Sequence, residues 1–178
     1  MKLLKLPLKI QKIFLVSDLQ TTYYKTPIGT AKIVGNKNGI QSISVVDDII
    51  ENTTDIPPCL QNCVSQLDEY FKGNRKKFDL KLNPKGTEFQ KKVWSALTNI
   101  PFNKTRSYLE QSKQLGDVKA IRAVATANGA NAISIIVPCH RIIGSTGEMV
   151  GYAGGISTKR KLLELEYRNT DQSQNKLF

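Results

Sequence analysis

The stretch Ile133-Ser134-Ile135-Ile136-Val137-Pro138-Cys139-His140-Arg141 joins a β-branched apolar run to a pair of reactive side chains. The run 133–137 predicts a buried strand, which Pro138 ends because proline cannot donate to a sheet ladder. Cys139 follows at once and precedes His140, the only histidine in the sequence. A thiol becomes a strong nucleophile when a nearby base or cation favours its ionised form, so Cys139 is a candidate nucleophile and His140 a candidate base.

The geometry of an extended chain disfavours a direct contact between the Cys139 and His140 side chains. Neighbouring side chains of an extended chain point to opposite faces, so a direct hydrogen bond between the two is unfavourable and a bridging water is the better arrangement. A Cys-His dipeptide also occurs as a purely structural pair, and the dipeptide alone leaves both interpretations open.

The sequence on the N-terminal side of this stretch predicts a group of helices. Thr87 and Gln90 have the spacing of a capping box, which begins a helix that ends before Pro101. Two more helices, at about 107–115 and 117–128, flank a glycine, and this is the helix-turn-helix pattern. The pattern by itself is weak evidence for DNA binding, because many helical hairpins bind nothing.

The sequence on the C-terminal side is rich in glycine over 144–155. It lacks the Gly-Lys-Ser/Thr ending of a phosphate-binding loop, so we interpret it as backbone that can approach a flat ligand closely. Leucines at helical spacing predict a last helix over about 157–167.

The N-terminal half has the pattern of a small sheet with one helix. Residues 22–34 and 40–46 are β-branched and alternate around an Asn-Gly turn at 35–39, which predicts antiparallel strands. Pro57-Pro58 precedes a helix predicted over 59–72, and 81–86 reads as a linker. We therefore expect an α/β (α+β) protein. Residues 1–84 would form a small antiparallel sheet domain, and residues 85–178 a mostly helical domain with the helix-turn-helix.

Composition narrows the class of partner. The 178 residues carry a formal net charge of +11, which is typical of a protein that binds a polyanion such as nucleic acid or an acidic membrane surface. The charge alone leaves open the alternative of a protein that is merely basic. No stretch approaches the ~20 apolar residues of a membrane span, and lysines interrupt the N-terminal residues 1–9, which disfavours a secretion signal. The three cysteines form a poor disulfide framework. We expect a cytoplasmic protein, or a nuclear one if the source is eukaryotic, with Cys63 in the core rather than in a metal site.

Motifs along most of the chain resemble the O6-alkylguanine-DNA alkyltransferases, also called methylated-DNA–protein-cysteine methyltransferases. The resemblance covers about 22–168 and is strongest from Gly86 onward. The matching segments are Gln66–Gly73, Gly86–Gln90, Val93-Trp94, Ser107-Tyr108, Arg122–Val124, Asn128–Asn131, Ile135–Ile143, Gly151–Gly155 and Leu163–Glu166.

This resemblance implies a role for each residue that matches a family motif. Cys139 would accept the alkyl group, His140 would act as base through a water, Glu166 would orient His140, and Asn131 would tie the helix hairpin to the active-site strand. The residues implied to contact substrate or DNA are Tyr108 (proton or hydrogen bond to the leaving guanine), Arg122 (insertion where the base is flipped out), Tyr152, Ala153 and Gly154 (walls of the guanine pocket), and Gln90 and Ser145 (DNA backbone).

The resemblance also implies the reaction. An alkyl group on O6 of guanine, or O4 of thymine, in double-stranded DNA would pass irreversibly to Cys139 in a single turnover. The protein would act as a monomer from the minor groove, with no metal or organic cofactor. The alternatives are a lesion sensor that binds without transfer, a cysteine hydrolase, and a basic helix-turn-helix regulator.

The chain departs from the family pattern at several points. Ala132 stands where relatives often have proline, and Ile121 where they often have a smaller residue. The zinc ligands of some members have no counterpart. The non-catalytic alkyltransferase-like proteins have tryptophan at the acceptor position, and Cys139 argues against that branch.

Overall fold

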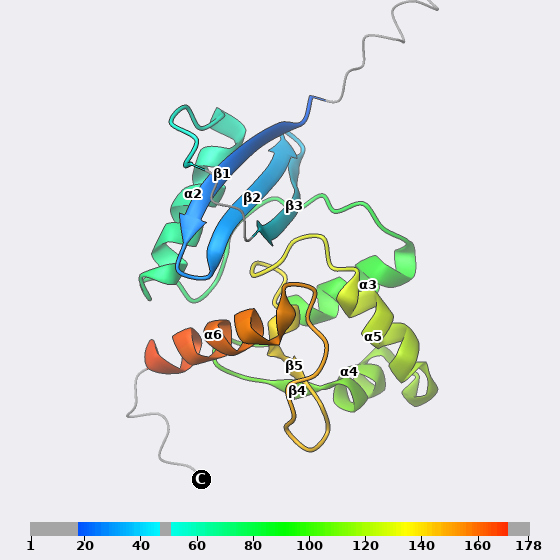
Figure 1. Ribbon diagram of the computed structural model, residues 1–178. Helices are drawn as coiled ribbons and strands as arrows, with labels where there is room; N and C mark the ends of the chain where they lie inside the picture. The colour runs from blue at the N-terminus through cyan, green and yellow to red at the C-terminus, as the bar shows by residue number, and fades with distance from the viewer. Residues whose placement is uncertain (1–17, 47–50, 171–178) are drawn as a thin grey trace, which may run out of the picture.

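The computed structural model describes residues 18–46 and 51–170 (Figure 1). The lysine-interrupted segment 1–9, which we weighed as a secretion signal, lies outside the described residues. Among the helices that are described, none is both long and apolar enough to cross a membrane.

The N-terminal half is a three-stranded antiparallel sheet of β1 (Gln20–Thr26), β2 (Gly29–Asn36) and β3 (Gly39–Val46), in that order. Asn36 pairs with Gly39, so the turn is the residue pair 37–38 and β2 extends two residues into the predicted turn at 35–39. The short loop fits because Gly39 adopts φ +130°, which side chains disfavour.

Helix α2 (Pro58–Phe71) packs on one face of this sheet (Figure 1). Its buried side chains recur every three or four residues, so one apolar stripe faces the strands. Cys63 belongs to this stripe and is fully buried, which confirms its expected place in the core. The members of the stripe are Leu60, Cys63, Val64, Leu67 and Tyr70.

The C-terminal half contains α3 (Glu88–Thr98), α4 (Tyr108–Leu115), α5 (Ile121–Gly129) and α6 (Gly155–Arg168). The expected capping box at Thr87 and Gln90 is present, and Ser107 forms a second one with Glu110. These boxes satisfy amide groups that the first turn of a helix leaves without partners.

The predicted helix-turn-helix is α4 and α5, and its second helix begins later than expected. Gly116 ends α4 in the left-handed region at φ +94°, and a short 3-10 helix, η1 (Val118–Ala120), precedes α5. Asp117 caps η1 by accepting from the Lys119 amide. Asp117 therefore serves as a cap rather than as the first helical residue.

The predicted strand at 133–137 is wrong. Only Ile133 makes a β-bridge, to Ile43 of β3, and the chain then turns, with the Val137 amide donating to the Ile133 carbonyl. Ile135 has φ +74°, a conformation that β-branched residues rarely adopt. Burial explains the mistaken prediction. The apolar side chains at positions 133, 135, 136 and 137 are buried in the core by packing rather than by pairing in a sheet.

The turn leads into the 3-10 helix η2 (Cys139–Arg141) and the two-residue strand β5 (Ile142–Ile143). Strand β5 pairs in parallel with β4 (Arg106–Ser107), the segment before α4. The segment that follows the reactive pair is thus paired with a segment distant in sequence, and neither short strand was predicted.

The two halves meet along β3. The Ile43 amide donates to the Ala132 carbonyl at 2.8 Å and the Ser134 amide donates to the Ile43 carbonyl at 3.0 Å. The predicted linker 81–86 also docks here, because the Ile40 amide donates to the Lys81 carbonyl. The edge of the N-terminal sheet therefore supports the turn that carries Cys139.

Candidate active site

Cys139 lies at the start of η2 with only 8% of its surface exposed. Its Sγ accepts a hydrogen bond from Asn131 Nδ2 at 3.1 Å. Burial raises the pKa of the thiol, while the Asn131 hydrogen bond and the positive charge of Lys159 partly offset that rise. A buried thiol that begins neutral needs a base to accept its proton when it attacks.

His140 is fully buried and its Nε2 lies 2.8 Å from Glu166 Oε1. A carboxylate at this distance accepts a hydrogen bond, so Nε2 carries the proton. The other ring nitrogen, Nδ1, is then the basic one. Nδ1 is buried and has no hydrogen-bond partner in the described part of the chain. Burial lowers the pKa of His140 despite the adjacent carboxylate, so the ring is neutral and able to accept a proton.

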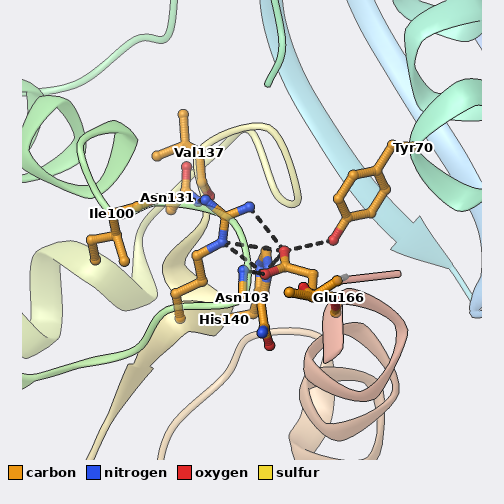
Figure 2. A network of polar contacts seen from close by, with 9 residues as sticks. Tyr70, Ile100, Asn103, Asn131, Val137, His140 and Glu166 are labelled. Carbon is orange, nitrogen blue, oxygen red and sulfur yellow. Dashed lines mark hydrogen bonds and ion pairs between the residues drawn. The ribbon is translucent and has the colours of Figure 1, made fainter. Parts of the chain in front are cut away.

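The Glu166 carboxylate, on α6, is the centre of a buried polar network (Figure 2). Arg141 donates to both of its oxygens, at 2.9 Å to Oε1 and 3.1 Å to Oε2, and the backbone N–H of Asn103 donates to Oε2 at 2.8 Å. Tyr70, from α2, donates to Oε1 at 2.8 Å. Burial by itself would raise the pKa of this carboxyl, but the hydrogen bonds from His140 and Arg141 lower it to about 2.

Asn131 shapes the turn as well as contacting the thiol. Its Oδ1 accepts from the Ile133 amide at 3.0 Å, and its Nδ2 donates to the Val137 carbonyl at 2.8 Å. One side chain thereby closes the turn and places a donor on Sγ. The structure joins Asn131 to Cys139, and His140 to Glu166, as two hydrogen-bonded pairs.

A cavity of about 150 Å³ opens beside Cys139. Tyr108 stands at its side half-buried, and its hydroxyl donates to the Val150 carbonyl at 3.5 Å. Burial raises the pKa of Tyr108, and that of Tyr152 more strongly, so both phenols are neutral. The lining residues are Tyr108, Ala125, Asn128, Gly129, Cys139, Gly151, Tyr152 and Ala153.

Four other residues expected at the site, Arg122, Ser145, Gly154 and Gln90, do not line this cavity. Arg122 is exposed on α5, and Ser145 is exposed in the turn before Gly147. Gly154 is the N-cap of α6 and does not line the cavity. The Gln90 side-chain oxygen accepts from the Thr87 amide in the capping box, and the expected contact of Gln90 with the DNA backbone stays a prediction.

Sequence reasoning missed Lys159. It is fully buried on α6, and its Nζ donates to the carbonyls of Ile142 and Val150, the latter at 2.7 Å. Burial lowers its pKa, and its charge favours the Cys139 thiolate. The available signal was helical spacing, because Lys159 shares the stripe of Leu162 and Glu166, which are also buried.

The fold and the site together define a class of protein: a helix-turn-helix borders a pocket that holds a cysteine, and a buried histidine–carboxylate pair lies next to it. Within the described residues, no three His, Cys, Asp or Glu side chains gather as a metal site.

Comparisons with known proteins agree with this class. The model of the 6-O-methylguanine DNA methyltransferase ribonuclease-like domain matches residues 19–84, and that of the DNA binding domain matches residues 88–168. The chain belongs to the 6-O-methylguanine DNA methyltransferase family.

Similar proteins include curated methylated-DNA–protein-cysteine methyltransferases. The Methanosarcina acetivorans protein is 44% identical over 152 residues, which cover 80% of this chain and 95% of that protein. The Mycobacterium tuberculosis protein is 44% identical over 151 residues, which cover 81% of this chain and 92% of that protein.

Solved structures agree. The M. tuberculosis O6-methylguanine methyltransferase superposes with a TM-score of 0.77 at 40% identity, over 88% of this chain and 98% of that one. The M. tuberculosis OGT in complex with DNA gives 0.75 at 42% identity, over 85% and 94%.

Proposed function

We propose that this chain repairs alkylated DNA by moving the alkyl group to Cys139 and that each molecule acts once. The observation that carries the proposal is the site itself. A neutral buried thiol opens on a cavity, and a neutral histidine with a free ring nitrogen lies next to it in the sequence. Membership of the methyltransferase family supports the same reaction.

In the proposed step, Cys139 Sγ attacks the alkyl carbon on O6 of guanine. The S–C bond forms as the C–O6 bond breaks. The thiol proton passes through a bridging water to His140 Nδ1, and Glu166 stabilises the imidazolium that results. Guanine leaves with the bonding electrons and takes a hydrogen bond or proton from Tyr108. A thioether has no easy hydrolytic exit, which makes the reaction stoichiometric.

The protein would bind one duplex as a monomer, with α5 in the minor groove. An enzyme that acts on a base edge must extrude that base, at a cost of a few kcal/mol. Exposed Arg122 would fill the gap, and the small residues near it, such as Ala123, would let the helix approach closely. Tyr152, Ala153 and backbone near Gly154 would wall the guanine, while Ser145 and Gln90 would contact the DNA backbone.

We propose a division of labour at about residue 84, with the acceptor and DNA-binding parts in 85–178. The cysteines of the described residues are free thiols. Free thiols fit a reducing compartment, which is the cytoplasm, or the nucleus in a eukaryote.

Mass spectrometry after incubation with a duplex containing one O6-methylguanine tests the proposal. We expect the peptide that holds Cys139 to gain one methylene, up to one equivalent, and the Cys139→Ala variant to bind the duplex without any gain. A duplex with unmodified guanine is the control. Lesion-dependent binding with no mass gain would instead identify a sensor.

Arg122→Ala separates base flipping from chemistry. We expect it to slow repair of duplex DNA about tenfold or more, and to leave the reaction with a free O6-alkylguanine base unchanged. Equal loss on both substrates would contradict a role in flipping.

A further inference from the structure

Tyr70 connects the N-terminal half to the candidate active site. It lies on α2, within the segment that matches the ribonuclease-like domain model, and 96 residues separate it from Glu166. Its hydroxyl donates to Glu166 Oε1 at 2.8 Å, and His140 Nε2 contacts the same oxygen at 2.8 Å (Figure 2). No reasoning from sequence placed Tyr70 at the site.

Packing alone does not account for the Tyr70 hydroxyl. The ring stacks edge-on or tilted against Phe71, Phe78 and Phe102, with centroids 5.3, 5.3 and 6.1 Å away. A phenylalanine would make the same ring contacts. The hydroxyl instead adds a donor to a carboxylate that Arg141 and the Asn103 amide already satisfy. Like Arg141, it donates to Oε1, the oxygen that His140 Nε2 contacts, but it is a neutral donor and it comes from the N-terminal half.

We propose that Tyr70 is a positioning residue for the alkyl transfer, which holds Glu166 in place and keeps His140 neutral so that it can accept the thiol proton. The assignment rests on the proposed function. Its physical basis is that Tyr70 donates to the same oxygen that His140 Nε2 and Arg141 contact, which places the donors' partial positive charges close together. The Tyr70 proton therefore disfavours the positive charge of an imidazolium, and it shares the electron density of Oε1 that an imidazolium would use.

Other charged groups act on His140 in the same or the opposite direction. The Glu166 carboxylate favours the imidazolium, while burial and two nearby cations oppose it. Tyr70, a neutral donor to Glu166, is the contribution of the N-terminal half to this network. The titratable groups around the ring are Glu166 and Lys159 on α6, Arg141 and Cys139 on η2, and Tyr70 on α2.

The test uses the fact that the chain has one histidine. The imidazole signals in a carbon–proton NMR spectrum therefore belong to His140 alone, and their pH titration needs no assignment. We expect Tyr70→Phe to raise the pKa of His140 relative to the unaltered chain. Nitrogen shifts should show Nε2 protonated and Nδ1 bare at pH 8 in both.

Tyr24→Phe is the matched control. Tyr24 also donates to a carboxylate, Asp68 Oδ1, at 2.8 Å, and Asp68 lies on the same helix as Tyr70. Both substitutions remove one tyrosine–carboxylate hydrogen bond, but only one of these carboxylates contacts His140. We expect Tyr24→Phe to leave the His140 titration unchanged.

The rate of methyl transfer provides the second readout. In Tyr70→Phe the acid limb of the pH–rate profile should move to higher pH, with transfer about fivefold slower at pH 6.5 and equal to that of the unaltered chain at pH 9. A merely structural defect would lower the rate by the same factor at every pH. That result, or an unchanged His140 titration, would overturn the proposal.

If Tyr70→Phe does not fold, the His140 titration can be measured with 3-fluorotyrosine at position 70 instead. Its hydroxyl is a stronger donor, so the pKa of His140 should fall, and a rise would overturn the assignment. The two proposals also fail separately. If the unaltered chain transfers no methyl group while Tyr70→Phe shifts His140, the proposed function is wrong and the hydrogen-bond assignment stands.

Discussion

Cys63 and Cys139 are both buried thiols, yet their surroundings differ in every respect that matters for reactivity. Cys63 lies in the apolar stripe of α2, and burial raises its pKa to about 12 with nothing to offset it. Cys139 is also shifted upward by burial, but Asn131 donates to its sulfur and a cavity reaches it. Burial alone makes a thiol inert, and the neighbouring donors, charges and access turn one of the two into a candidate nucleophile.

The largest effect expected from this comparison comes from exchanging the sulfur itself. Cys139→Ser should reduce methyl transfer at least about a thousandfold, because a neutral hydroxyl is a far weaker nucleophile than sulfur. Cys63→Ala should retain the full rate and lose only about 1–2 kcal/mol of stability from the cavity it creates. Single-turnover assays and urea unfolding measure the two quantities. Transfer by Cys139→Ser would contradict the assignment of the acceptor.

The next largest effect concerns the donor that Cys63 lacks. Asn131→Ala removes the hydrogen bond to Sγ and opens the turn that Asn131 closes, so transfer should fall about 100-fold and the thiol pKa should rise. Thiolate absorbance, followed against pH in a chain whose other cysteines are alanine, reports that pKa directly. An unchanged titration would show that the donor does not stabilise the thiolate.

A smaller effect should follow from removing the buried cation. Lys159→Met takes away a charge that favours the Cys139 thiolate and removes the ammonium donor from the carbonyls of Ile142 and Val150. We expect transfer to slow about tenfold and stability to fall by about 1–3 kcal/mol. Lys161→Met, at an exposed position of the same helix, is the matched control and should change neither quantity. Equal behaviour of the two variants would refute a role for the buried charge.

The smallest effect expected is in the pH dependence of stability. The native pKa of His140 is below its ordinary value, so the unfolded chain binds the proton more readily. Its contribution to stability is therefore full above about pH 6.5 and is lost as the pH falls towards the lower native value. Glu166 adds a loss of the same sign between its ordinary pKa of 4.5 and about 2.

Thermal unfolding at pH 7 and pH 5 measures the histidine part of this dependence. The melting temperature should fall by about 3–6 °C in the unaltered chain and by less in His140→Asn. Cys63→Ala should keep the full pH dependence, since Cys63 has no titrating partner. A melting temperature that rises on acidification would mean that His140 is charged in the folded protein.

Much of the fold could be predicted from local sequence. The capping residues Thr87 and Gly116, the Asn-Gly turn and the apolar spacing of α2 each act within a few neighbouring residues, and the helices formed within two residues of their expected bounds except at the start of α5. The failure at 133–137 has a specific cause. A β-branched apolar run looks the same whether it is buried by pairing in a sheet or by packing in a turn.

The candidate site divides in the same way. The sequence by itself determined the residue types, and its motifs named Cys139, His140, Glu166 and Asn131. Only the tertiary structure decided that Tyr70 donates to Glu166 and that Lys159 lies buried under the active-site loops. Periodicity marks such residues as buried but cannot name their partners, because a hydrogen bond across 96 residues depends on how distant helices pack.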